Sequence, residues 1–188
     1  RLEFKIDNRV IGGDNPVFFI AEAGVNHNGS LEIGKKLIDV AIDSGADAVK
    51  FQTFKAEELN TFNAPKSAYH IETTGNDNEQ SWFDLLKTQE ISRTMHIELI
   101  DYCNKNNIIF LSTPYGFDSA DLLDDLNVSA FKIASTDTNN LPLLKHIAKK
   151  NKPMILSSAM CAFDEVMEAV STVRNSGLED VAMLQCTG

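Results

Sequence analysis

The sequence predicts an α/β domain built on a parallel sheet, and three observations point to it. Short segments rich in Ile, Val, Phe and Leu recur along the chain, and each is apolar on both faces, as strands buried in a parallel sheet are. Amphipathic segments with helical spacing separate them. The order is strand, helix, strand, helix, which implies right-handed crossovers between parallel neighbours.

The individual elements follow from local signals. Residues 2–13 are typical of a short hairpin with Asp7 and Asn8 at its turn. Ser30 can cap the first helix, Gly45 can end it, and Gly177 can end the last one. The expected strands span residues 17–23, 48–53, 108–114, 130–135, 153–158 and 181–187. The expected helices span residues 31–44, 92–106, 118–126, 141–150 and 163–176.

One interval departs from this regular pattern. Residues 54–87, between the second and third parallel strands, form a much longer connection that is polar and rich in Asn and Thr. We expect a loop over one face of the domain, because long insertions in compact domains are often functional lids.

Polar residues at the strand ends favour a barrel over an open sheet. The residues concerned are Glu22, Lys50, Gln52, Ser112, Thr113, Lys132, Ser135, Ser157, Ser158, Gln185 and Thr187. In a (β/α)₈ TIM barrel the carboxyl ends of all strands converge on one site. No GxGxxG or Walker-A loop supports a nucleotide-binding sheet. We therefore expect residues 1–188 to be a truncated barrel domain, holding the hairpin and about six strands, with two further βα units after Gly188.

Composition limits the classes of ligand. The 188 residues are 43% hydrophobic and carry a formal net charge of −10, which disfavours a general nucleic-acid-binding surface. No apolar run is long enough to span a membrane. Cys103, Cys161 and Cys186 are odd in number and widely spaced, which predicts reduced thiols in a cytoplasmic protein. An anionic ligand must then be bound by a local cluster of donors.

Two lysines provide such a cluster. Lys50 and Lys132 lie near the ends of otherwise apolar strands, where an ammonium group is costly unless it is paired or binds an anion. The neighbouring hydroxyls are those of Ser112, Thr113, Ser135 and Ser157. Lysine suits phosphate as a point charge. A surface-reaching lysine, an ion pair with Glu22 and a Schiff-base role remain open alternatives.

The other candidate groups carry weaker signals. Glu22 ends the first parallel strand and could orient water or act as an acid or base, or simply pair with Lys50. His27, within an Asn-His-Asn-Gly turn, could donate a proton or a hydrogen bond to a substrate, although a lone loop histidine usually does neither. His70, His96 and His146 show no metal-ligand spacing, and surface or packing roles are expected for the latter two.

The motifs together resemble those of the sialic acid synthase family. Residues 18–30, FFIAEAGVNHNGS, resemble its opening, and the matches continue in family order at residues 48–53, 111–114, 131–140, 155–160 and 184–187. The resemblance implies a (β/α)₈ barrel. It also implies condensation of phosphoenolpyruvate with an N-acetylated hexose, either N-acetylmannosamine or a 2,4-diacetamido relative, to give a nine-carbon keto acid and phosphate.

The resemblance also implies roles for single residues. It places Glu22, Lys50, Thr113, Lys132, Ser135 and Ser157 at the phosphoenolpyruvate site, with Glu22, Lys50 and Lys132 as the catalytic residues. It places Gln52, Asn76 and Asp137 at the sugar site; some relatives carry Glu at the Asp137 position, which leaves the sugar open. Gly188 falls where relatives often have Asn or Ser in the phosphate site.

Further expectations from the resemblance lie beyond these residues. A divalent metal, Mn²⁺ or Mg²⁺, is expected to be held by two histidines downstream of the chain. A C-terminal antifreeze-like domain and a homodimer are expected for the full-length protein. The six strands alone would leave edges exposed and would not form a stable active monomer. The alternatives are a Schiff-base lysine aldolase on the same barrel and a non-catalytic sugar-phosphate-binding module.

Overall fold

The computed structural model describes residues 3–59 and 82–187 and begins with the expected hairpin. Strand β1 (Glu3–Ile6) pairs antiparallel with β2 (Arg9–Gly12). Asp7 at the turn has a φ of 52°, a left-handed conformation that Asp tolerates better than most residues. The hairpin prediction is therefore confirmed.

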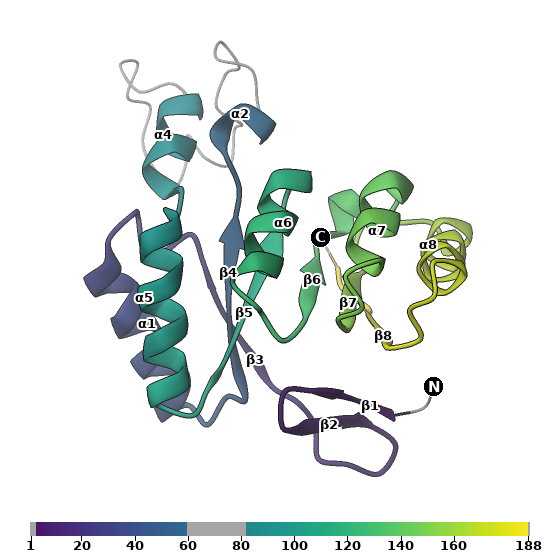
Figure 1. Ribbon diagram of the computed structural model, residues 1–188, viewed down its shortest axis with the longest axis horizontal. Coiled ribbons are helices and arrows are strands. Elements are labelled where there is room, and N and C mark those ends of the chain that lie inside the picture. Colours follow the sequence, from purple (N-terminus) through teal and green to yellow (C-terminus); the bar gives the residue numbers. More distant parts are fainter. Residues whose placement is uncertain (1–2, 60–81, 188) are drawn as a thin grey trace.

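Six parallel strands follow in two groups of three. They are β3 (Ile20–Gly24), β4 (Ala48–Thr53) and β5 (Ile109–Pro114), then β6 (Phe131–Ile133), β7 (Met154–Ser157) and β8 (Val181–Leu184). Each group is hydrogen-bonded in chain order, and β5 packs beside β6 without a regular ladder. Figure 1 shows the two groups with the helices around them. The α/β prediction is confirmed, whereas the described residues do not by themselves form a closed barrel.

Helices connect the parallel strands. They are α1 (Leu31–Asp43), α5 (Arg93–Lys105), α6 (Phe117–Asp125), α7 (Leu141–Ala148) and α8 (Phe163–Asn175). The Ser30 hydroxyl accepts a hydrogen bond from the Ile33 N–H at 3.3 Å, which confirms the expected cap of α1. Gly45 follows the end of α1 with a φ of 74°. No helix in the described ranges is long and apolar enough to cross a bilayer.

The long interval is helical at both of its ends, so the prediction of a plain loop is wrong there. Helix α2 (Ala56–Leu59) opens it and α4 (Trp82–Gln89) closes it, while residues 60–81 lie outside the described ranges. The carboxylate of the residue directly after α4 joins the two helices. Glu90 accepts the N–H of Ala56 at 2.8 Å and pairs with Lys55 at 3.3 Å and Lys87 at 3.0 Å.

Strand β6 is shorter than expected. It ends at Ile133, and Ser135–Asp137 wind into a 3₁₀-helix, η1. Strand β8 likewise ends at Leu184. The polar residues at these positions therefore lie just beyond the strands, in η1 and in the segment after β8.

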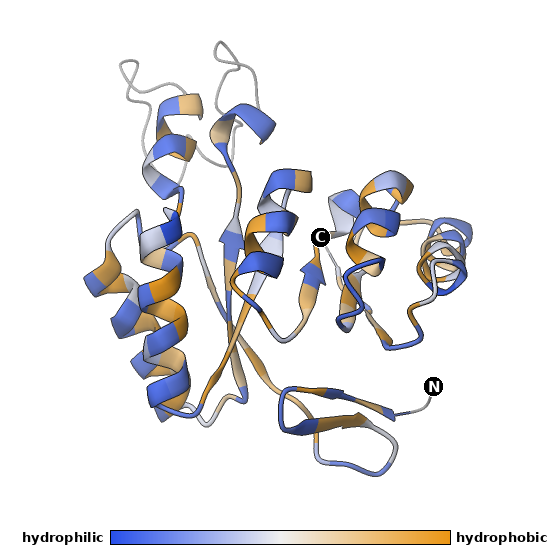
Figure 2. Cartoon of the chain, in the orientation of Figure 1, coloured by the Kyte–Doolittle hydropathy of each residue, from blue (hydrophilic) through white to orange (hydrophobic). Residues whose placement is uncertain are grey.

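The two faces of the sheet bury different apolar layers. The outer layer packs against the helices and includes Phe51, Phe110 and Leu156. The inner layer joins Ala48, Ile109, Leu111, Ala130 and Ile155 to Phe4 and Ile6 of the hairpin. In Figure 2 the strands are mostly hydrophobic, whereas each helix carries both kinds of residue. The hairpin thus makes an apolar floor below the inner face.

Candidate functional site

The candidate site begins with an ion pair across β3 and β4. Glu22 and Lys50 are register partners, and Nζ of Lys50 lies 2.5 Å from Oε2 of Glu22. The Lys50 side chain is 11% exposed, whereas that of Glu22 is 54% exposed. The ion-pair alternative is therefore realised, with the ammonium buried and its carboxylate partner open to solvent.

A second ammonium group comes from β6. Lys132 is 6% exposed and donates to the Ile133 carbonyl at 2.9 Å and the Ser157 hydroxyl at 2.5 Å. Among the described residues it has no carboxylate within ion-pair distance. Burial, together with repulsion from Lys50, lowers the pKa of Lys132 to about 8. A buried cation without a counter-charge favours binding of an anion.

An amide and a hydroxyl group lie nearer the strand ends than the two lysines. Gln52 and Thr113 are register partners on β4 and β5. A Cβ atom at Gly24 would lie 3.2 Å from Oε1 of Glu22 and 3.8 Å from Nε2 of Gln52. Gly24, with a φ of 55°, therefore leaves room for both polar side chains at the end of β3. The structure brings these sequence-predicted residues to one edge of the sheet.

The 3₁₀-helix after β6 adds Ser135 and Asp137. The Asn140 amide donates to Oδ1 of Asp137 at 3.2 Å. The Thr138 hydroxyl donates to the Ser157 carbonyl at 2.6 Å, which ties this turn to the end of β7. Ser135 contributes its carbonyl to a 3.5 Å contact with the Cys161 thiol.

Tyr115 is a site residue that sequence reasoning missed. Burial raises the pKa of its hydroxyl to about 12, and the charges of Glu22 and Asp137 act in the same direction. The phenol is therefore a neutral donor near carboxylates from two different strand ends. The available signal was its position directly after the polar end of β5.

Cys186 is the second missed residue. Hydrogen bonding by Ser157 lowers the pKa of its thiol against the opposing effect of burial, and the N–H groups of Ser158 and Ala159 and the charge of Lys132 assist. The signal was its spacing of two residues from Leu184, the register partner of Ser157.

Two expected residues do not join the cluster. Ser112 and His27 lie on the helix side of the sheet: the Ser112 hydroxyl is 2.7 Å from that of Thr53, and His27 is fully buried with its ring 6.0 Å from that of Phe51. A direct substrate role for His27 stays a prediction. Asn76 lies outside the described ranges.

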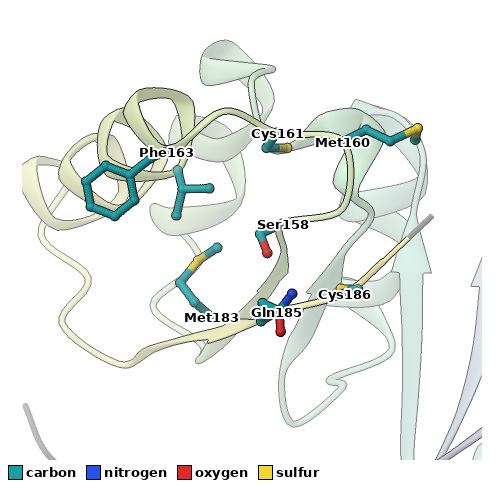
Figure 3. A pocket seen from close by; sticks show the side chains of 8 residues that line it. Ser158, Met160, Cys161, Phe163, Met183, Gln185 and Cys186 are labelled. Atoms are coloured by element: carbon teal, nitrogen blue, oxygen red, sulfur yellow. The ribbon is translucent and has the colours of Figure 1, made fainter.

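A cavity of about 500 Å³ lies beside the ends of β7 and β8. Its lining residues are Ser158, Met160, Cys161, Phe163, Val166, Met183, Gln185 and Cys186, most of them labelled in Figure 3. Within residues 3–59 and 82–187, no group of three or more His, Cys, Asp or Glu side chains is arranged to hold a metal ion.

Comparisons with known proteins show the family of the chain. The NeuB family model matches residues 37–188. The chain is 46% identical to the N,N'-diacetyllegionaminic acid synthase of Campylobacter jejuni over 89% of its length, which is 50% of that protein. It thus spans about half the length of the curated relatives it matches.

Two crystal structures resemble the fold closely. That of the spore coat polysaccharide biosynthesis protein SpsE from Bacillus subtilis is 41% identical with a TM-score of 0.81, over 99% of this chain and 48% of that one. That of the N-acetylneuraminic acid synthetase from Leptospira borgpetersenii is 32% identical with a TM-score of 0.82, over 99% and 59% respectively.

Proposed function

The chain belongs to the NeuB family, and from that premise we propose that it is the phosphoenolpyruvate-binding part of a sialic-acid-type synthase. The full-length protein would join phosphoenolpyruvate to an N-acetylated amino sugar and release phosphate. We further propose that the six parallel strands belong to a (β/α)₈ barrel. The single observation that carries the proposal is Lys132, a buried ammonium group beside a hydroxyl and without a carboxylate partner in the described part.

The chemistry of phosphoenolpyruvate suits this cluster. Its phosphate and carboxylate need cations and hydrogen-bond donors on a protein of net charge −10. Lys132 supplies a charge with a pKa of about 8, so it is roughly nine-tenths protonated at pH 7. Lys50 supplies a second charge, while Thr113 and Ser157 supply hydroxyls. These residues would neutralise the anion and hold its alkene carbon toward the sugar aldehyde.

Glu22 would act as the base in the addition of water. In the proposed reaction the alkene carbon of phosphoenolpyruvate bonds to the aldehyde carbon, and water adds to the carbon that carries the phosphate. That intermediate expels phosphate by C–O cleavage. The Glu22 carboxylate is solvent-exposed and hydrogen-bonded by Lys50, so it can take a proton from the attacking water.

The sugar site would lie above the lysines. Gln52 and Asp137 would bind sugar hydroxyl or amide groups, and Tyr115 would add a neutral donor between Glu22 and Asp137. Asn76 is proposed for the same site from sequence alone. The relatives are named as synthases of different acids, so the amino sugar stays open within the N-acetylmannosamine and 2,4-diacetamido classes.

The metal and the assembly remain proposals. The described residues do not fit a metal site, so no step here is routed through one. We infer that Mn²⁺ or Mg²⁺ ligands come from downstream histidines, that the full-length protein is a homodimer with a C-terminal antifreeze-like domain, and that it is cytoplasmic.

Phosphate release by the full-length protein tests the proposal. The assay uses phosphoenolpyruvate, Mn²⁺ and a panel of N-acetylated hexoses, with EDTA as the control. Metal-dependent release with one sugar supports the synthase and identifies its substrate. A protein that fails to bind phosphoenolpyruvate would contradict the anion site.

One observation favours a second candidate. A lysine whose pKa is lowered by burial and by a second lysine is suited to Schiff-base formation, and Lys132 has both features. Borohydride trapping with a keto acid separates the two, because a covalent adduct on Lys132 would indicate an aldolase.

A further inference from the structure

The turn between β3 and α1 is built around one imidazole ring. Three residues of this stretch, Gly24, Asn28 and Gly29, have φ values of 55°, 48° and 73°. Nδ1 of His27 accepts the Gly29 N–H at 2.9 Å, which closes the turn from inside. Burial lowers the pKa of His27, so the ring is neutral and its one proton lies on Nε2.

The second nitrogen of this ring makes no such bond. His27 is fully buried, and its Nε2 has no hydrogen-bond partner among the described residues. A buried N–H group without an acceptor costs more free energy than one ordinary hydrogen bond returns. The bond from Gly29 therefore does not offset the burial of the imidazole, and a phenyl ring would fill the space without this cost. Stability alone does not account for His27.

The ring of His27 also contacts the strand that carries two site residues. It packs on Phe51 of β4 with the ring centroids 6.0 Å apart, and Phe51 stacks on Phe110 at 5.6 Å. Phe51 belongs to the layer that packs against the helices, so its neighbours Lys50 and Gln52 extend from the opposite face of the strand. His27 thus rests against the back of the strand that supplies both side chains.

The end of β3 is irregular at the same level. In the ladder with β4, Phe51 pairs with Gly24, and Ala23 is an extra residue directly after Glu22. Such bulges are uncommon in parallel pairs, and next to active sites they re-aim a side chain. The turn that His27 closes begins at this bulge. The direction of the Glu22 side chain therefore depends on how the turn is held.

We propose that His27 is a positioning residue of the synthase reaction. Through the bond from Gly29 and the contact with Phe51 it fixes the bulge, and so it aims the Glu22 carboxylate at the carbon where water adds. This inference rests on the proposed function, which gives Glu22 the role of base. It predicts that the Nδ1 acceptor governs turnover, whereas the bulk of the ring governs stability.

His27→Phe removes the acceptor and keeps a ring against Phe51. Gly29 is exposed, so its N–H can bind water in this variant. In the phosphate-release assay on the full-length protein, we expect kcat to fall about tenfold, because a small misplacement of a catalytic group is costly. The affinity for phosphoenolpyruvate, measured by calorimetry, should stay within about twofold. The midpoint of denaturant unfolding should not fall.

His27→Asn makes the opposite change. Its side-chain oxygen can accept the Gly29 N–H, as in an Asx turn, but the ring is lost. The unfolding midpoint should fall while kcat stays within about twofold of the unmodified protein. Ile38→Val, which trims a fully buried side chain of α1, is the matched control. It should lower the midpoint and leave kcat unchanged, which shows that lost stability alone does not slow turnover.

Each result bears on the proposal. Full kcat in His27→Phe would overturn it. An equal loss of kcat in both His27 variants would also overturn it, and would indicate that the imidazole contacts substrate directly. If His27→Phe does not fold, His27→Asn decides alone, and a tenfold loss of kcat there contradicts the positioning role.

Failure of the proposed function gives a different result. In that case the unmodified protein releases no phosphate with any sugar of the panel. Crystal structures of the unmodified protein and of His27→Phe then test the geometry. We expect the Glu22 carboxylate to move away from Nζ of Lys50 in the variant, and an unchanged ion pair would overturn the aiming of Glu22 by His27.

Discussion

The Thr53 hydroxyl lies 2.8 Å from Nε2 of His96, in a hydrogen-bond chain with a fixed direction. Nδ1 of His96 is 2.9 Å from the Ser92 carbonyl and must donate to it, so Nε2 accepts from Thr53. Thr53 in turn accepts from Ser112 at 2.7 Å. This neutral chain joins the start of α5 to the ends of β4 and β5, beside Gln52 and Thr113.

The hydrogen-bond chain through His96 predicts that the fold loses stability in acid. Burial lowers the pKa of His96 from 6.5 to about 4, so the unfolded chain takes up a proton first as pH falls below 6.5. Stability is full above that pH and declines down to about pH 4. Between pH 7 and pH 5 we expect a loss of about 2 kcal/mol from this group.

Denaturant unfolding of the full-length protein at the two pH values measures this loss. His96→Gln keeps an acceptor for Thr53 and does not titrate, so its pH dependence should be smaller by that amount. His146→Gln, which alters an exposed ion pair with Asp121, is the matched control. An identical pH dependence in His96→Gln and the unmodified protein would refute the role of His96.

Lys132 predicts a pH limit on anion binding. Its ammonium is charged below a pKa of about 8, so the affinity for phosphoenolpyruvate should fall about tenfold between pH 7 and pH 9. The Lys132→Arg variant should bind phosphoenolpyruvate weakly, because the planar guanidinium group does not match the position of Ser157. Its affinity should depend little on pH, because arginine stays charged. Calorimetry measures both, with Lys145→Arg on the exposed side of α7 as control. A flat profile for the unmodified protein would contradict the assignment.

Glu22→Gln separates binding from turnover. The amide can still accept from Lys50, so phosphoenolpyruvate should bind at least as tightly once the negative charge is gone. Turnover should fall about 100-fold because the amide cannot take a proton from water. Phosphate release and calorimetry on one preparation give both quantities. Glu32→Gln in the first turn of α1 is the control, and full turnover in Glu22→Gln would exclude the proposed role.

Two glycines with the same backbone conformation predict different costs of substitution. Gly29 and Gly45 have φ values of 73° and 74°. A Cβ at Gly29 would lie 2.5 Å from the Thr88 carbonyl oxygen, whereas one at Gly45 meets nothing within 4 Å. Gly45→Ala should cost about 1 kcal/mol of backbone strain, and Gly29→Ala clearly more. Equal unfolding midpoints would show that the turn after β3 moves freely away from α4.

Sequence periodicity predicted the elements well and the faces of the strands less well. Lys50 and Gln52 are two residues apart, so they had to share a face. Ser112 and Thr113 are adjacent, so only one could face the site. Because β5 is apolar on both faces, the sequence does not say which one. The register with β4 decides it, by placing Thr113 beside Gln52.

Helices α2 and α4 show a second limit of prediction from the sequence. Their segments are short and polar, and the carboxylate of Glu90, directly after α4, joins them through Ala56 and Lys87. The contact with Ala56, 34 residues away along the chain, depends on the tertiary fold and leaves no local pattern. Cys186 was missed for a related reason, since the groups that lower the pKa of its thiol come from β6, β7 and the segment after β7.

The hairpin below the inner face has a consequence for the order in which substrates bind and products leave. Phe4 and Ile6 close the apolar floor under the sheet, so in the proposed barrel molecules would reach the two lysines past the strand ends. An anion at Lys50 and Lys132 lies deeper along the strands than a sugar at Gln52 and Thr113. Phosphoenolpyruvate, the deeper reactant, must therefore bind first, and the phosphate released from it must leave last. Product-inhibition kinetics should therefore show phosphate competing with phosphoenolpyruvate and not with the sugar.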